Sequence, residues 1–199
     1  MLKQKNSRES AAIRGRVLGI DPGTLRVGFA LVDRAGNSYT ALEYGVIRAS
    51  GPLPGRLKII FEALTALAEK HHPTVLALED VFFGKDIRAM EKIGEGRAIA
   101  KLVAAQQGME VAEYPPATVK LAVAGNGAAS KEAVARMVTA AFGLAEPPHP
   151  ADASDALALA LCHCTRGPAP SAAARPRSRR KGWTLADVTG LVAGRSPQS

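Results

Sequence analysis

Residues 17–36 read VLGIDPGTLRVGFALVDRAG: an apolar run ends at Asp21, a Pro-Gly turn follows, and a second apolar run begins. This pattern predicts two strands joined by a tight turn. A carboxylate at the end of a buried strand loses hydration, which costs several kcal/mol unless it gains a hydrogen bond, a cation or a metal. Gly23 can take a positive φ, so the chain can reverse and leave Asp21 open to a ligand. Asp21 is therefore a candidate ligand-binding acid, although an aspartate also organises turns through its own backbone.

The composition predicts one well-packed domain with tails. The chain has 199 residues, of which 47% are apolar and 22% are charged, enough to bury a core. The first residues, MLKQKNSRES, lack the apolar centre of a signal peptide, and no run of 18 apolar residues exists. We therefore expect a cytoplasmic protein with no membrane partner. Cys162 and Cys164 lie two apart on a predicted helix and point in different directions, so we expect packing there rather than a disulfide.

The net charge of +8 is concentrated in the tails. Residues 1–15 carry four basic and one acidic group, and residues 166–199 carry seven basic and one acidic group. The remaining segment, 16–165, holds 15 basic and 16 acidic groups, a balance of −1. A near-neutral body that binds a polyanion must gather its basic groups on one face and keep its acids apart or neutralise them with metal.

The elements outside the opening stretch predict a mixed sheet flanked by helices. Strand patterns cover 16–21, 26–33 and 39–49 as an antiparallel meander, and shorter ones cover 74–79 and 109–114. Helical spacing covers 56–71, 86–107, a short segment after Pro116, 131–143 behind Ser130, and 151–164. Three antiparallel strands followed by alternating helices and strands give an α/β fold. We divide the chain into a basic extension (1–15), this domain (16–165) and a tail (166–199).

The tail reads PAPSAAARPRSRRKG over residues 168–182, a composition that cannot support a core and predicts a flexible basic linker. Beyond it, WTLADVTGLVAG places Thr184 three residues before Asp187, with apolar residues on one stripe. A short amphipathic helix is expected there.

Three further acids can join Asp21 at one site. Glu79 ends its strand as Asp21 ends the first, and Asp152 and Asp155 lie at i and i+3 on one helix face. Carboxylates gathered in this way repel each other unless a cation neutralises them, and an all-oxygen set suits Mg²⁺ or Mn²⁺. Acids in the first turn of a helix also stabilise its dipole, so that role remains open for Asp152 and Asp155.

Four separated stretches together make the chain resemble the RuvC family of Holliday-junction resolvases over about residues 16–165. They are GIDPGT, LALEDVFFGKD, EGRAIA and HPADASDALALALCHC, in this order. The resemblance implies a ribonuclease H-like mixed five-stranded sheet, a homodimer, and a metal-dependent endonuclease that nicks two strands of a four-way DNA junction symmetrically and leaves 5′ phosphates. It also implies work in recombination and repair beside the RuvA–RuvB branch-migration complex.

The resemblance assigns roles residue by residue. Asp21, Glu79, Asp152 and Asp155 match the family's catalytic acids, which hold two Mg²⁺ or Mn²⁺ ions. Lys120 and Lys131 match basic positions beside the active site, and Phe82 matches an aromatic residue that stacks on an unpaired base. Without the family match, Phe82 or Phe83 would read as core and the lysines as solvated surface. The expected DNA contacts are Phe82, Phe83, Lys85, Arg88, Lys92, Arg97, Lys120 and Lys131. Lys101 lies on the helix predicted over 86–107, together with Arg88, Lys92 and Arg97.

Other interpretations of the sequence stay open at this point. GIDPGTLRVG also fits YqgF-type ribonuclease H-like proteins, which would act on RNA, but those chains are shorter and we do not expect EDVFFGKD in them. The actin and hexokinase group of ATPases uses a similar acid-glycine-threonine turn but needs two large domains. A junction-binding protein without catalysis is a further alternative, against which the four acids argue.

Overall fold

The computed structural model describes residues 15–80 and 87–166, with the side chains of 87–93 left out. Strands and helices follow one another as the sequence predicts. They are β1 (Gly15–Asp21), β2 (Arg26–Ala35), β3 (Ser38–Arg48), α1 (Leu53–His71), β4 (Val75–Glu79), α2 (Ile87–Gln106), β5 (Glu110–Tyr114), α3 (Pro116–Ala124), α4 (Lys131–Phe142) and α5 (Ala151–Arg166).

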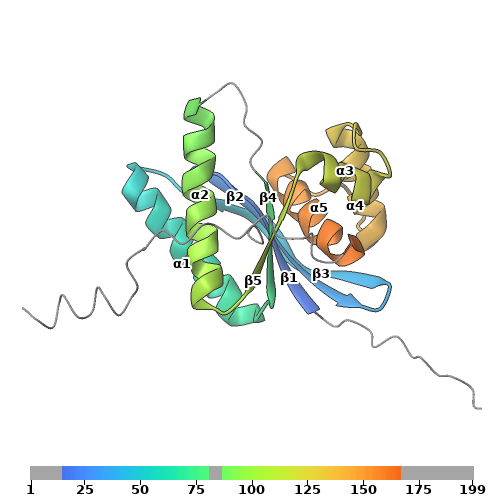
Figure 1. Cartoon of the computed structure of the whole chain (residues 1–199), viewed down its shortest axis with the longest axis horizontal. Helices are drawn as coiled ribbons and strands as arrows, with labels where there is room; N and C mark the ends of the chain where they lie inside the picture. Colours follow the sequence, from blue (N-terminus) through green and yellow to red (C-terminus); the bar gives the residue numbers. More distant parts are fainter. Residues whose placement is uncertain (1–14, 81–86, 167–199) are drawn as a thin grey trace, which may run out of the picture. The chain divides into compact units, whose positions relative to one another are not determined.

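The five strands form one mixed sheet in the order β3-β2-β1-β4-β5 (Figure 1). Short turns join β1, β2 and β3, so these three pair antiparallel. Strands β4 and β5 follow long helices and pair parallel, β4 with β1 and β5 with β4, because a parallel neighbour needs a crossover connection. The predicted mixed five-stranded sheet is confirmed.

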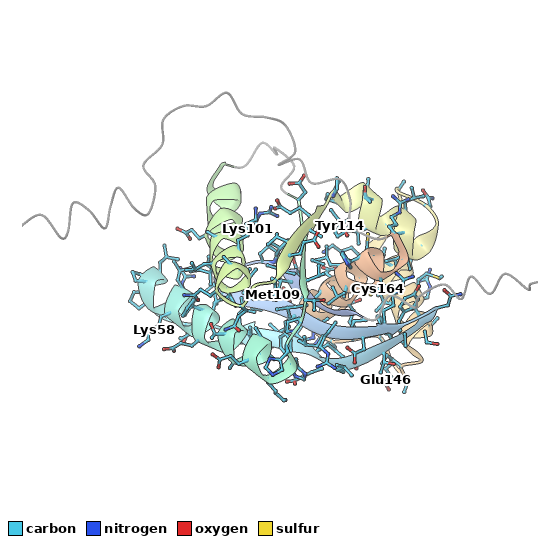
Figure 2. The ribbon with its side chains drawn as sticks, turned by 60° about the horizontal axis from the view of Figure 1, so that its bottom comes forward. Lys58, Lys101, Met109, Tyr114, Glu146 and Cys164 are labelled. Atoms are coloured by element: carbon cyan, nitrogen blue, oxygen red, sulfur yellow. The ribbon has the colours of Figure 1, made fainter. Side chains whose placement is uncertain are left out.

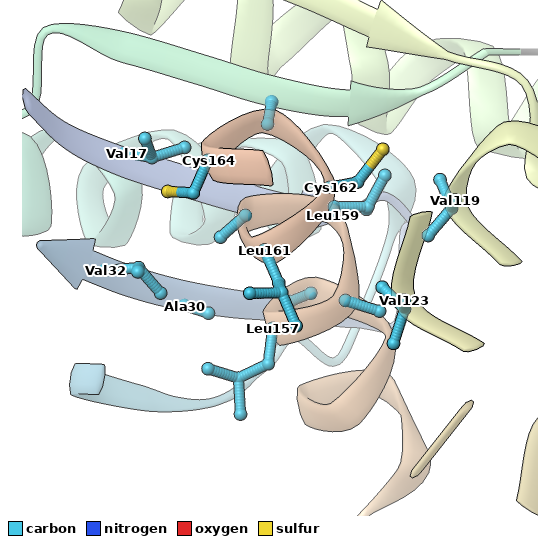
Figure 3. Packing of buried hydrophobic residues seen from close by; sticks show 14 of the residues in the cluster. Val17, Ala30, Val32, Val119, Val123, Leu157, Leu159, Leu161, Cys162 and Cys164 are labelled. Atoms are coloured by element: carbon cyan, nitrogen blue, oxygen red, sulfur yellow. The ribbon is translucent and has the colours of Figure 1, made fainter. Parts of the chain in front are cut away.

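Helices cover both faces of the sheet. Helices α1 and α2 lie on one side, and α3, α4 and α5 lie on the other (Figure 1). Alternate residues of β1 pack against the two helical layers. Leu18 packs toward Ile60 and Leu64 of α1, whereas Val17 packs with α5 residues such as Leu161. Figure 3 shows the second of these cores around α5. Burial on both faces fixes the register of the central strand.

Helix α1 begins three residues earlier than the apolar pattern predicts. The sequence GPLPG looks like a break, yet the helix starts at Leu53, with Pro52 as its N-cap and a proline in its first turn. Proline has no N–H, and the first-turn N–H groups of a helix have no intrahelical partner, so Pro54 is tolerated there.

Two glycines allow close backbone contacts near the strand ends. A Cβ on Gly28 of β2 would lie 1.9 Å from the carbonyl oxygen of Asp152, so the missing side chain lets the first turn of α5 rest on the sheet. On the opposite face, a Cβ on Gly96 of α2 would lie 2.6 Å from the carbonyl oxygen of Gly23. The turn after Asp21 therefore touches α2 directly through backbone.

Cys162 and Cys164 are buried free thiols on α5 (Figures 2 and 3). Burial raises the pKa of each thiol to about 11. Within residues 15–80 and 87–166, no helix combines the length and apolar character that crossing a bilayer requires. The predicted N-terminal extension, most of the tail and its short helix lie outside the described residues.

Candidate active site

A cleft of about 300 Å³ opens at the end of the sheet where β1 and β4 stop. Its polar lining comes from Asp21, Glu79 and Asp155 together with Lys120 and Lys131. Its apolar walls are Pro116, Val119, Val134, Ala158 and Leu159. Residues from β1, β4, α3, α4 and α5, far apart along the chain, thus meet in one place.

Parallel pairing places Asp21 and Glu79 side by side. Ile20 of β1 lies opposite Leu78 of β4, so the acids that follow end neighbouring strands at the same edge. One residue further, the Asp80 amide donates to the Tyr114 carbonyl at 2.8 Å. This bond extends the pairing of β4 with β5 past Glu79 and holds that end of the strand in place.

The gathered acids oppose one another's ionisation. Burial, followed by the charges of Asp155, Glu79 and Asp152, raises the pKa of Asp21 to about 7. The pKa of Glu79 is also raised, first by burial and then by Asp155. Such shifts mark a site where negative charge is concentrated and an added cation would be favourable.

Lys131 supplies part of the missing positive charge. Its ammonium donates to the Asp155 carboxylate at 3.2 Å. The pKa of Lys131 is raised, mainly by Asp155 and to a smaller extent by Asp21 and Glu79. Lys131 stands at the start of α4, directly after the N-cap Ser130, whose hydroxyl accepts from the Ala133 amide at 3.2 Å. The cap fixes where α4 begins and so where this lysine stands.

Asp152 lies outside the set of residues that line the cleft, although it is one turn from Asp155. Its carboxylate lies 3.6 Å from Nε of Arg26, at the start of β2. Sequence reasoning missed Arg26. The available signal was its position two residues before Gly28, which puts both residues on the same face of the strand.

The other predicted DNA contacts have mixed placements. Arg97 is buried and pairs with Glu113 of β5, and Lys101 bonds to the same carboxylate at 2.7 Å. These placements favour a structural role for both over contact with phosphate. Arg88 and Lys92 lie in the first part of α2, residues 87–93, whose side chains are not described. Phe82, Phe83 and Lys85 lie outside the described residues.

The donor set fits a hard divalent cation by its chemistry. Asp21, Glu79 and Asp155 offer only carboxylate oxygens, which Mg²⁺ and Mn²⁺ prefer. Their mutual repulsion, visible in the raised pKa of Asp21, would be relieved by such an ion. In the described part of the chain, no three His, Cys, Asp or Glu side chains already stand at metal-binding spacing.

Comparison with known proteins gives a consistent result. The model of the family described as "Crossover junction endodeoxyribonuclease RuvC" matches residues 17–163. Proteins of that name from Chloroflexus aggregans and Moorella thermoacetica are 42% and 45% identical to the chain over 155 and 154 residues. The alignments cover 77% and 76% of this chain and 94% and 92% of those proteins.

Solved structures agree with the sequence matches. Thermus thermophilus RuvC in complex with a Holliday junction substrate superposes with a TM-score of 0.72 at 33% identity, covering 76% of this chain and 93% of that one. The yeast mitochondrial Holliday junction resolvase Ydc2 shares the fold, with a TM-score of 0.57 at 12% identity over 76% of this chain and 78% of that one.

Proposed function

This chain belongs to the RuvC family of crossover junction endodeoxyribonucleases and is a Holliday-junction resolvase, and we propose that it cuts by two symmetric, metal-dependent nicks that leave 5′ phosphates. The family match decides among the alternatives that the sequence left open. The observation that carries the chemical proposal is the cleft that brings Asp21, Glu79 and Asp155 together with two lysines. The cellular role that we infer is resolution of junctions in recombination and repair, in the cytoplasm.

Asp21, Glu79, Asp155 and, from the neighbouring turn of α5, Asp152 would hold two Mg²⁺ or Mn²⁺ ions. When bound, such ions supply an activated water and stabilise the leaving oxygen. Asp21 ends the strand next to that of Glu79, and the charges of Asp155, Glu79 and Asp152 all act on it. Because burial and these three acids raise its pKa to about 7, we assign Asp21 as the carboxylate whose charge matters most.

Lys120 and Lys131 would hold the phosphate at the cleft. Both line it from the α3 and α4 side, and Lys131 already carries a raised pKa and a bond to Asp155. An ammonium positioned in this way can stabilise charge that develops on the phosphate oxygens. Phe82, by the family's pattern, would stack on an unpaired base near the crossover, a contact worth about 1 to 3 kcal/mol.

Symmetric cutting of a four-way junction requires two copies of the cleft. A homodimer would supply them, and the RuvA–RuvB branch-migration complex would be its partner in the cell, as the family resemblance implies. The deep burial of the β1–β4 strand pair between two helical layers gives each cleft a rigid base.

A synthetic four-way junction with labelled strands tests the proposal. We expect the wild-type protein to nick two opposing strands only when Mg²⁺ or Mn²⁺ is present, and ligase to seal the products. Asp21→Asn should abolish nicking and leave junction binding nearly intact, because the amide keeps the shape and loses the charge. Substantial nicking by Asp21→Asn at saturating Mg²⁺ would contradict the assigned role of Asp21, and equal cutting of a linear duplex would contradict junction selectivity.

A further inference from the structure

A pair of arginines lies at the ends of β2 and β3, near the acids of the active site. Arg26 begins β2 and Arg48 ends β3, and the two residues lie directly opposite each other in the antiparallel register. Residues that face each other in this way project from the same side of the sheet. Two guanidinium groups therefore stand together at the edge where β1 also ends.

The register identifies the face on which the pair lies. Arg26 is two residues before Gly28, and Gly28 lies opposite Asp21 in the β1–β2 pairing. A side chain on Gly28 would point at the first turn of α5. The contact of Arg26 with Asp152 at 3.6 Å agrees with this placement. Both arginines thus lie on the α5 side of the sheet, the side on which the acids gather.

The positive charge of this pair is largely uncompensated within the described residues. Arg26 has one loose ion pair and a side chain that is 56% exposed. Arg48 is exposed and has no ion-pair partner among the side chains that the structure describes, those of residues 15–80 and 94–166. Like charges placed directly opposite each other on two strands are destabilising. The arrangement gains nothing for the fold, and it suits an external anion.

We propose that Arg26 and Arg48 form a phosphate-binding subsite for the DNA backbone next to the scissile phosphate. This inference rests on the proposed function. It adds two arginines to the lysines that are proposed to bind the DNA backbone. The DNA strand would be held by Lys120 and Lys131 in the cleft and by the arginine pair beside Asp152. Guanidinium groups suit this purpose because they bind phosphate oxygens in a bidentate manner.

The test measures how junction affinity depends on salt. We would titrate a fluorescent four-way junction with protein in EDTA, so that no strand is cut, at several KCl concentrations. Arg48→Gln is the more direct test, because Arg48, unlike Arg26, has no ion pair with Asp152. We expect it to reduce the slope of log Kd against log salt by about 0.9, the value for one phosphate that is no longer neutralised. Arg26→Gln should do the same, and Arg48→Lys should retain most of the slope.

Arg34→Gln is the matched control. It removes the same charge from the far end of β2, where the Arg34 Nε donates to the Gly36 carbonyl at 3.0 Å. Thermal unfolding of each variant is measured alongside, and Arg48→Gln should unfold no earlier than the wild type. A slope for Arg48→Gln equal to that of Arg34→Gln, in a wild-type protein that binds and cuts the junction, would overturn the subsite alone. A wild-type protein that neither binds nor cuts the junction would overturn the proposed function as well.

Discussion

At the scale of single residues, the environment of Asp21 opposes its negative charge. The residue ends a central strand, and burial and three neighbouring acids raise its pKa to about 7. The unfolded chain would release that proton near pH 4. Between these two values the folded state binds a proton at Asp21 that the unfolded state has released, so the contribution of Asp21 to folding stability falls as the pH rises.

The raised pKa of Asp21 predicts that the metal-free protein becomes more stable when Asp21 loses its charge. In EDTA at pH 8, we expect Asp21→Asn to raise the free energy of unfolding, on the order of 3 kcal/mol. At pH 4 the gain should disappear, because the aspartate is then protonated in the folded state. Urea unfolding at the two pH values measures the difference. A gain of equal size at both would show that the charge of Asp21 is not its cause.

Lys131 provides the second prediction at this scale. Lys131→Gln should lower the single-turnover cleavage rate by about 100-fold, because the ammonium beside Asp155 and the cleft is removed. Lys131→Arg should lose less. Arg136→Gln is a suitable control, since Arg136 is exposed on the same helix and does not line the cleft. Equal losses for Lys131→Gln and Arg136→Gln would assign the effect to general loss of charge.

The acids that line the cleft were easier to predict from the sequence than the cations that lie beside them. Asp21 and Glu79 could be found because each follows an apolar run, and the ends of parallel neighbours share one edge. Arg26 could not be found this way, because its closeness to Asp152 depends on the register of β2 and on the close backbone contact between α5 and Gly28. Arg97 looked like a phosphate contact until folding placed Glu113 beside it.

At the scale of elements, α2 contacts the turn that follows Asp21 directly through backbone atoms. Gly96 leaves no room for a side chain next to Gly23, whereas Gly94, two residues earlier on the same helix, has open space around it. The pair offers a direct comparison of a glycine required by packing with one that packing does not require.

We expect opposite effects from the two alanine substitutions. Gly96→Ala should destabilise the protein by about 1 to 3 kcal/mol, because the new methyl group meets a carbonyl oxygen that cannot move aside. Gly94→Ala should stabilise it by about 0.5 to 1 kcal/mol through the helix preference of alanine. Denaturant midpoints for both variants check the prediction, and a loss of stability for Gly94→Ala would contradict it.

Another link between elements joins β5 to α5. The Tyr114 hydroxyl and Nδ1 of His163 lie 2.7 Å apart, and their rings meet edge to face. Burial lowers the pKa of His163 below its usual value of 6.5, while Glu110 raises it and Arg34 lowers it. The neutral ring is therefore the form that the fold prefers.

The contribution of His163 to folding stability should consequently fall as the pH drops below 6.5, opposite in sign to that of Asp21, since the unfolded chain takes up a proton at His163 before the folded chain does. His163→Gln should remove this contribution, so the variant should gain stability relative to the wild type as the pH falls below 6.5. Thermal unfolding across this range, in wild type and variant, measures it. An unchanged pH dependence in His163→Gln would mean that other groups cause the effect.

At the scale of the whole molecule, the charge is divided between a near-neutral domain and basic ends. Arg175, Arg177, Arg179, Arg180 and Lys181 form the densest basic cluster, and they lie outside the described residues. We infer that this segment tethers the enzyme to DNA of any sequence, because phosphate contacts do not read bases. The fold could be predicted because strand and helix periods differ plainly. The tail has no such period, so its role rests on charge alone.

Deleting residues 167–199 should weaken binding to any duplex and flatten its salt dependence by about 0.9 log units for each phosphate that the tail neutralises in the full chain. Single-turnover cleavage at saturating enzyme should barely change. The fluorescence of Trp183, the single tryptophan, can report on the tail in the full chain. An unchanged salt slope would instead favour docking of residues 183–192 on a partner protein, and earlier unfolding of the truncated chain would favour docking on the domain.

The buried thiols of α5 have a practical consequence for anyone who wishes to watch this enzyme at work. At neutral pH a thiol with a pKa near 11 is almost entirely unreactive toward maleimide dyes, and both native cysteines are also shielded from solvent. A single new cysteine at Leu25, a residue that is 59% exposed on the turn between β1 and β2, would therefore accept a dye selectively in the otherwise native chain. Energy transfer from that dye to a labelled junction arm could then follow each cutting event in real time.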